Sequence, residues 1–130
     1  MFNEGSIRNY QRKATQWTPG KNFDKTGAFG PALVTPDGLP EAMHGVRILT
    51  RLNSEIMQDA STSDLIFPVR RLDVILSEIM TLEPGDVVAT GTPEGVGHAR
   101  RPPVWMKAGD YVEVEIAGLG VLANTIVDEN

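Results

Sequence analysis

The chain has 130 residues, 41% hydrophobic and 22% charged, which suffices for one domain with a packed core and excludes an extended disordered protein. Its formal net charge is −5, and its basic residues do not cluster, so no nucleic-acid partner is expected. The absence of cysteine removes disulfides and thiolate chemistry, and the lack of a membrane-length apolar run or a signal-peptide pattern leads us to expect a cytoplasmic protein with no membrane partner.

The first third of the chain predicts one helix and one strand. Residues 6–17 are predicted as a short helix that Ser6 could cap, although the helical period is weak, and residues 18–20 end it. Residues 21–30 are expected to form a loop rich in glycine and aromatic side chains. Residues 31–35 are predicted as a short apolar strand.

The middle of the chain predicts a β-hairpin. Residues 46–52 alternate between apolar and polar side chains, which is typical of a half-buried strand. Asn53 and Ser54 are predicted to form a tight turn, because asparagine tolerates a positive φ angle. Residues 55–58 return as the second strand, and residues 60–64 form a polar loop.

The second half predicts the clearest helix and three more strands. Residues 68–80 form the helix, with an apolar face made by Leu72, Ile75, Leu76 and Ile79. Residues 87–90 are predicted as a short buried strand, residues 111–116 alternate cleanly, and residues 121–127 return as their partner. Strands outnumber helices, so the fold class is α+β, mostly β.

A glycine-rich loop follows the predicted strand at residues 87–90. Glycines at 91, 95 and 97 permit sharp bends or a close approach to a ligand, and the hydroxyl of Thr92 is free to donate or accept a hydrogen bond. The loop lacks the Gly-Lys-Ser/Thr ending of a phosphate loop and the spacing of a dinucleotide fingerprint. Glycines that only make turns remain the alternative.

Two groups near the N-terminus could carry chemistry. Glu4, Arg8 and Gln11 are spaced so that they would share one helix face, and together they could hold a metal and an anionic substrate. An ordinary surface ion pair is the alternative. Lys21 lies between a turn and aromatic residues, where a partly buried ammonium could stabilise an enolate, although most lysines are simply solvated. The two histidines have no metal-ligand spacing and are interpreted as surface or loop residues.

Four motifs in fixed order resemble the fumarylacetoacetate hydrolase family. They are Asn-Glu-Gly-Ser-x-Arg-x-Tyr-Gln, Gly-Lys-x-Phe-Asp, Phe-Gly-Pro, and Pro-Gly-Asp-Val-Val-Ala-Thr-Gly-Thr-Pro-x-Gly-Val-Gly, and the closing Gly-Asp-Tyr-Val-Glu-Val-Glu-Ile also looks like that family. The resemblance covers nearly the whole chain. It implies a mixed β-sandwich or β-roll of the fumarylacetoacetate hydrolase type, with residues 1–130 as the C-terminal part of a single catalytic domain.

The resemblance also implies a function. The family binds Mg²⁺ or Mn²⁺, and its members cleave C–C bonds, decarboxylate or isomerise small 2-oxo acids, commonly as homodimers. Glu4 matches the position of a metal-ligating carboxylate. Arg8, Gln11 and Lys21 match pocket residues that hold the substrate or stabilise its enolate, and Thr92 with Gly91 matches a loop that contacts the substrate carboxylate.

The sequence departs from the family pattern in one respect that concerns chemistry. Two further metal carboxylates, in a Glu-x-Glu pair, and a His/Glu pair that activates water normally lie upstream of Glu4 and are not in these residues. Two interpretations follow. The chain is part of a metal-dependent 2-oxo acid enzyme, or it is an inactive assembly module that keeps the fold and the dimer surface.

Overall fold

A computed structural model describes residues 1–129 as a mostly β structure with two α-helices and five short 3₁₀ helices. The main elements are β1 (Phe2–Glu4), α1 (Arg8–Gln11), β2 (Gly27–Phe29), β3 (Arg47–Leu52), β4 (Glu55–Ser61), α2 (Val69–Ser77), β5 (Tyr111–Ile116) and β6 (Gly120–Thr125). They form a two-stranded and a four-stranded sheet, both antiparallel, and this confirms the predicted fold class.

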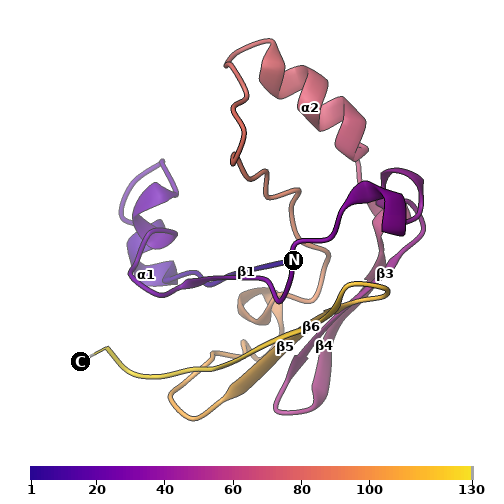
Figure 1. Cartoon of the computed structure of the whole chain (residues 1–130). Coiled ribbons are helices and arrows are strands. Elements are labelled where there is room, and N and C mark those ends of the chain that lie inside the picture. Colours follow the sequence, from indigo (N-terminus) through magenta and orange to yellow (C-terminus); the bar gives the residue numbers. More distant parts are fainter. Residues whose placement is uncertain (130) are drawn as a thin grey trace.

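The four-stranded sheet, in the order β4-β3-β5-β6, holds most of the buried core (Figure 1). Val112 and Val114 of the central strand β5 point to one face, which Leu122 of β6 shares, whereas Leu49 of β3 lies opposite Glu115 and points to the other face; all four are buried. The hairpin predicted from the sequence is confirmed, although its second strand continues through Ser61 into the segment expected to be a polar loop. Asn53 and Ser54 take φ angles of 50° and 70°, as a two-residue turn requires.

The turn of that hairpin is tied to the start of β5 by side chains. The Asn53 amide donates to Asp110 Oδ1 at 2.9 Å, and its carbonyl accepts from the backbone N–H of Tyr111 at 2.8 Å. The other oxygen of Asp110 accepts from the backbone N–H of Lys107. These bonds hold the pKa of Asp110 below its usual range, with the Asn53 bond as the main cause. Asp110 is buried, so this cluster locks two hairpins together.

A second, smaller ribbon forms from segments that the sequence did not predict as strands. Residues 2–4 pair with residues 27–29, so that Phe2 lies opposite Phe29 and Glu4 lies opposite Gly27. The expected loop at residues 21–30 therefore contains a strand. The predicted strand at residues 31–35 is wrong, because that segment is irregular and its apolar side chains, such as Leu33, lie in solvent without a neighbouring strand.

The predicted helix at residues 6–17 is mostly wrong. Only Arg8–Gln11 is α-helical, and turns and a 3₁₀ helix, Thr18–Gly20, follow. The residue at the helix N-terminus is Ile7 with no side-chain cap, and Ser6 donates instead to the backbone carbonyl of Glu4. Residues 12–19 are exposed, so no apolar face stabilises a longer helix against the rest of the chain.

The predicted helix at residues 68–80 is confirmed as α2, which begins after Pro68. It stands apart from the sheet, and the chain descends from it through residues 81–92 toward the middle of the molecule (Figure 1). None of its residues is buried. The predicted buried strand at residues 87–90 has no ladder partner within residues 1–129, and Val87 is exposed.

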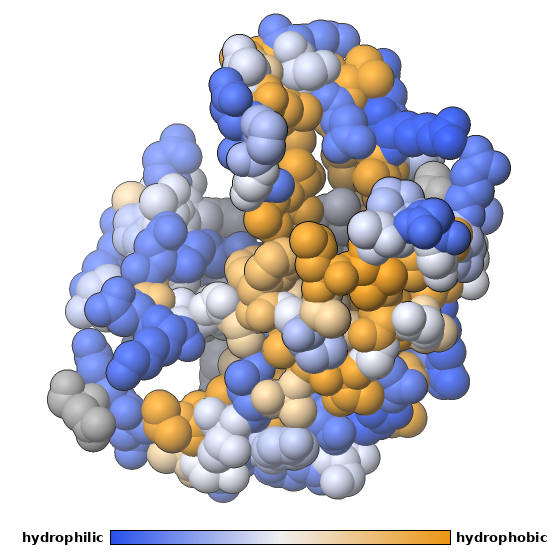
Figure 2. Space-filling view, viewed as in Figure 1, coloured by the Kyte–Doolittle hydropathy of each residue, from blue (hydrophilic) through white to orange (hydrophobic). Residues whose placement is uncertain are grey.

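Much apolar surface is therefore open on this side of the molecule. Figure 2 shows hydrophobic residues running from the inner side of α2 across the centre of the view. The exposed large side chains include Phe29, Ile66, Ile79 and Val87. Among residues 1–129 no helix is long and apolar enough to cross a bilayer.

Candidate active site

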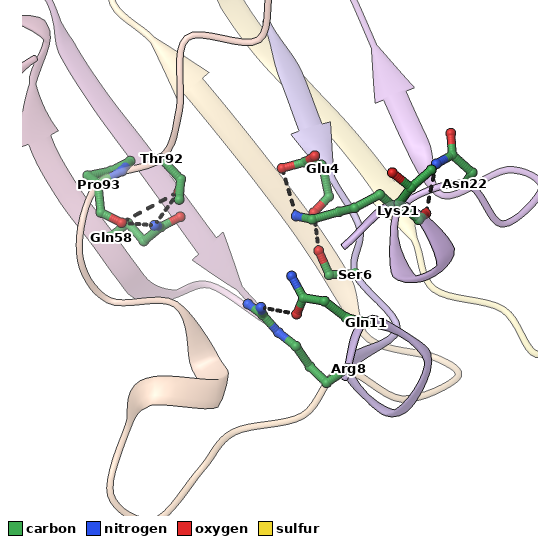
Figure 3. Close-up of polar contacts among 10 residues, drawn as sticks. Glu4, Ser6, Arg8, Gln11, Lys21, Asn22, Gln58, Thr92 and Pro93 are labelled. Atoms are coloured by element: carbon green, nitrogen blue, oxygen red, sulfur yellow. Dashed lines mark hydrogen bonds and ion pairs between the residues drawn. The ribbon is translucent and has the colours of Figure 1, made fainter. Parts of the chain in front are cut away.

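The predicted metal ligand and the predicted enolate-stabilising lysine are in direct contact. Glu4 is the last residue of β1, and Lys21 follows the 3₁₀ helix Thr18–Gly20. The Lys21 Nζ lies 2.8 Å from Glu4 Oε2, and the lysine side chain is only 22% exposed (Figure 3). The sequence interpretation of Lys21 as a partly buried ammonium thus agrees with its position, although Glu4 lies on a strand rather than on a shared helix face.

Arg8 and Gln11 form the neighbouring pair on α1. The Arg8 Nη1 donates to the Gln11 Oε1 at 2.7 Å (Figure 3), as their spacing of three residues in a helix predicts. Gln11 is buried, and its backbone lies so close to Gly20 that a Cβ on Gly20 would overlap it. The backbone carbonyl of Gly20 also accepts from the N–H of Ile7. Close packing of α1 on the 3₁₀ helix therefore fixes both pairs relative to one another.

Thr92 belongs to a separate group of contacts. Its hydroxyl accepts from the Gln58 amide at 3.0 Å, and the same amide donates to the carbonyl of Pro93 at 2.9 Å. Figure 3 shows this group apart from Glu4 and Lys21. The participation of Thr92 and Gly91 in the same pocket therefore stays a prediction. Gln58 was missed by sequence reasoning, because nothing in its local pattern signals a contact 34 residues away.

The three glycines of this loop serve different purposes. Gly95 has a φ angle of 98°, and a Cβ there would overlap the carbonyl oxygen of Met57 on β4. Arg100 reinforces the contact by donating to the same oxygen at 2.6 Å. A Cβ on Gly97 would overlap the carbonyl of Val104, whereas Gly91 faces open space. Close packing against β4 explains Gly95 and close packing against Val104 explains Gly97, whereas no neighbour restricts Gly91.

An apolar hollow of about 310 Å³ adjoins the Glu4 side of the ribbon. Phe2 and Phe29 line it from β1 and β2, and Val87 and Ala89 line it from the segment that leads to the glycine loop. Phe2 and Glu4 are two residues apart on β1, so their side chains lie on the same face. Neither Glu4 nor Lys21 is among the residues that line this hollow, so it is an apolar feature of the ribbon separate from the ion pair.

The donor set does not complete a divalent metal site. Within residues 1–129 no group of three or more histidine or acidic side chains is placed to hold a metal ion. Glu4 supplies one carboxylate, and Lys21 already neutralises it. Mg²⁺ and Mn²⁺ prefer several oxygen ligands. The described residues alone therefore fit one ligand of such a site.

His98 is more than the surface or loop residue that the sequence suggested. It lies in the 3₁₀ helix Gly97–Ala99, where it is half-buried and packs edge-on against Trp105. Its Nε2 contacts the guanidinium of Arg12, which directly follows α1. A sequence separation of 86 residues hides this contact from any local pattern.

The chain belongs to the fumarylacetoacetate hydrolase family. The family model for the C-terminal part of fumarylacetoacetate (FAA) hydrolase matches residues 1–127. The mitochondrial oxaloacetate tautomerase FAHD2A of Bos taurus is 44% identical over 124 residues, which cover 94% of this chain and 39% of that protein. The chain thus spans about two fifths of the length of this relative. The relative is mitochondrial by name, so the cytoplasmic location stays a prediction.

Solved structures agree with the family and its fold. A fumarylacetoacetate hydrolase from Exiguobacterium antarcticum superposes with a TM-score of 0.93 at 40% identity, over 98% of this chain and 46% of that one. A maleylpyruvate hydrolase from Sphingobium sp. SYK-6, solved with manganese(II) and pyruvate, gives a TM-score of 0.75 at 32% identity, over 87% of this chain and 39% of that one. Family relatives are thus enzymes that act on small organic acids.

Proposed function

We propose that this chain forms the C-terminal part, residues 1–130, of a catalytic domain that interconverts the enol and keto forms of a 2-oxo dicarboxylic acid such as oxaloacetate. The observation that carries the proposal is the half-buried Lys21 ammonium, held 2.8 Å from Glu4 with the Arg8–Gln11 pair close by (Figure 3). The 44% identity to an oxaloacetate tautomerase supports the choice of reaction.

Lys21 is proposed to stabilise the enolate. In the tautomerisation the enol O–H loses its proton, a carbonyl forms at that carbon, and the neighbouring carbon accepts a proton. Negative charge develops on the oxygen between these two transfers. A positioned ammonium that donates a hydrogen bond to this oxygen lowers the barrier, because its geometry is set before the reaction begins. Glu4 sets it through the ion pair.

Other residues are proposed to hold the substrate. Arg8 donates to Gln11 and retains further N–H groups that suit a carboxylate, which binds guanidinium groups with two hydrogen bonds. The Thr92 hydroxyl would donate a hydrogen bond to the substrate carboxylate from the side of the pocket opposite Lys21. Gly91, which has no close neighbour, would leave room for that carboxylate. This last role depends on the substrate bridging the Thr92 group and the Lys21 group.

A divalent ion, Mg²⁺ or Mn²⁺, is proposed as the cofactor of the complete site, with Glu4 as one of its ligands. The manganese and pyruvate bound to the related maleylpyruvate hydrolase support a metal in this family. When bound, such an ion would polarise a 2-oxo acid as a Lewis acid. Glu4 is the one carboxylate that this site offers within the described residues, and the proposed roles of Lys21, Arg8 and Thr92 do not depend on the ion.

Two alternatives to tautomerisation are other reactions of 2-oxo acids and a role without catalysis. C–C bond hydrolysis and decarboxylation of diketo or dicarboxylic acids from aromatic catabolism also pass through an enolate, so Lys21 would serve them equally. An inactive assembly module that retains a homodimer surface is the alternative. The exposed apolar surface between α2 and the β1–β2 ribbon is the observation that favours it.

The test is the rate at which the chain, joined to the N-terminal segment of a family relative that carries the Glu-x-Glu pair, removes the enol form of oxaloacetate, followed by its ultraviolet absorbance in the presence of Mg²⁺. Lys21→Met should reduce any rate above the uncatalysed one by about 10²-fold or more, since a single positioned donor contributes that much. Arg71→Gln, at an exposed position of α2, is the matched control and should keep the full rate. Equal rates for Lys21→Met and the unaltered chain would contradict the proposal and favour the assembly module.

A further inference from the structure

A cationic cluster lies between α1 and the 3₁₀ helix Gly97–Ala99. The Arg12 guanidinium contacts the Nε2 of His98, and the His98 ring packs edge-on against Trp105 with ring centres 6.2 Å apart. Arg8, one turn before Arg12, contributes positive charge that acts on His98. We call Arg8, Arg12 and His98 the cationic cluster.

The cluster differs from the other arginine environments of the chain. Three arginines each form an ion pair with a carboxylate at 2.6 to 2.8 Å, namely Arg47, Arg51 and Arg70. Arg8 and Arg12 bind neutral acceptors instead, an amide and an imidazole, and within residues 1–129 neither forms an ion pair. Arg71, Arg100 and Arg101 likewise form no ion pair within residues 1–129, so the distinctive feature of the cluster is that two guanidinium groups act on one imidazole.

The lowered pKa of His98 agrees with its position beside two guanidinium groups. Burial, and then the positive charges of Arg8 and Arg12, lower the pKa of His98 below its usual value. Neutral imidazole can accept from Arg12 through Nε2, which places its hydrogen on Nδ1. An anion bound between the two groups would offset the positive charges, and imidazolium would then become a second donor.

We propose that Arg12 and His98 bind a carboxylate, namely the distal carboxylate of a dicarboxylic 2-oxo acid. Arg8 connects this subsite to the proposed active site, since its Nη1 donates to Gln11 while its charge reaches His98. The inference rests on the proposed function for the identity of the substrate. The binding of a dicarboxylate by Arg12 and His98 does not require turnover. The subsite would select dicarboxylic over monocarboxylic substrates.

The subsite predicts a direction for the pH dependence of binding. Without an anion His98 is neutral at neutral pH, because its pKa is lowered by burial and by Arg8 and Arg12. A bound carboxylate raises that pKa, so binding takes up a proton. By linkage, dicarboxylate affinity therefore increases as the pH falls from above the raised pKa toward the lowered one.

The test uses the two histidines of the chain as separate reporters in NMR titrations of their ring Cε1–H signals. In 10 mM malonate we expect the pKa of His98 to increase by about half a unit or more relative to acetate at equal ionic strength, on the scale of a nearby opposite charge. His44, an exposed residue outside the cluster, should not respond. Arg12→Gln should abolish the malonate effect, whereas Arg71→Gln should retain it.

Three results would overturn the proposal. They are an unchanged His98 pKa in malonate, an equal response to acetate or sulfate, which would show an adventitious anion only, and a full malonate response in Arg12→Gln. Backbone amide spectra verify that Arg12→Gln is folded. If it does not fold, Arg12→Lys replaces it, and this variant should retain part of the malonate response because it keeps the positive charge. Because no step of this titration involves turnover, its failure is distinct from a failure of the Lys21 test.

Discussion

The four-stranded sheet and the part of the chain that carries the candidate site differ in how they are stabilised. The sheet joins the hairpins β3–β4 and β5–β6 through the pairing of β3 with β5, and it buries Leu49 and Val114. A hydrogen bond between Asn53 and Asp110 links the two hairpins. The β1–β2 ribbon, α2 and residues 81–92 leave large apolar side chains exposed, and α2 buries no residue. The candidate site therefore lies on the less buried part, while the sheet supplies most of the buried core.

The largest expected effect is a difference in the free energy of unfolding lost when one large side chain is truncated in each part. Leu49→Ala removes a side chain that is 6% exposed in the central strand, so it should lower the free energy of unfolding by about 2–4 kcal/mol. Ile79→Ala removes a comparable side chain that is 74% exposed just beyond α2, and should change it by about 0.5 kcal/mol or less. Urea denaturation measures both. Similar losses would show that the α2 side is packed in solution.

The second effect concerns the glycine loop, where it leaves the edge of the sheet. Gly95→Ala places a Cβ against the Met57 carbonyl at a φ of 98°, so we expect a loss of about 2–3 kcal/mol. Gly91→Ala meets open space at a φ of 109° and should cost about 1–2 kcal/mol, from backbone strain alone. Thermal unfolding with the two variants side by side gives the difference. A greater loss for Gly91→Ala would contradict the packing role of Gly95.

A smaller effect is the acid sensitivity of the turn that joins the two hairpins. The pKa of Asp110 is lowered mainly by the Asn53 hydrogen bond, so its contribution to stability is complete above its ordinary pKa of about 4 and is lost as the pH falls through the lowered value. Asp110→Asn should therefore be destabilised at pH 6, with a difference from the unaltered chain that shrinks toward pH 2. Asp73→Asn, exposed on α2, is the control and should show no such trend. A difference that is constant with pH would contradict the assignment.

The contrast between the two parts also explains what could be predicted from the sequence. The hairpin at Asn53 and the strand Tyr111–Ile116 follow from local alternation and turn chemistry, because their partners are close in sequence or equally amphipathic. Whether residues 2–4, 27–29 and 87–90 form strands depends on whether another strand lies beside them. No local sequence pattern gives that information. The contacts of Lys21 with Glu4 and of Thr92 with Gln58 also join distant segments, so motifs predicted three of these four residues as site residues but not the geometry of their contacts.

The smallest expected effect tests whether the candidate site is complete in these residues. Mg²⁺ with oxalate, an enolate mimic, should raise the Tm of this chain by less than about 1 °C, because a ligand stabilises a protein only in proportion to its affinity for the folded state. Glu4 offers one carboxylate, already paired with Lys21, and hard divalent ions bind weakly to a single carboxylate. Joining the chain to the N-terminal segment of a family relative that carries the Glu-x-Glu pair should restore a clear increase in Tm, which Glu4→Gln should then remove. A large increase for the 130-residue chain alone would show that its own residues form the metal site, and it would place the chemistry fully within the less buried part of the molecule.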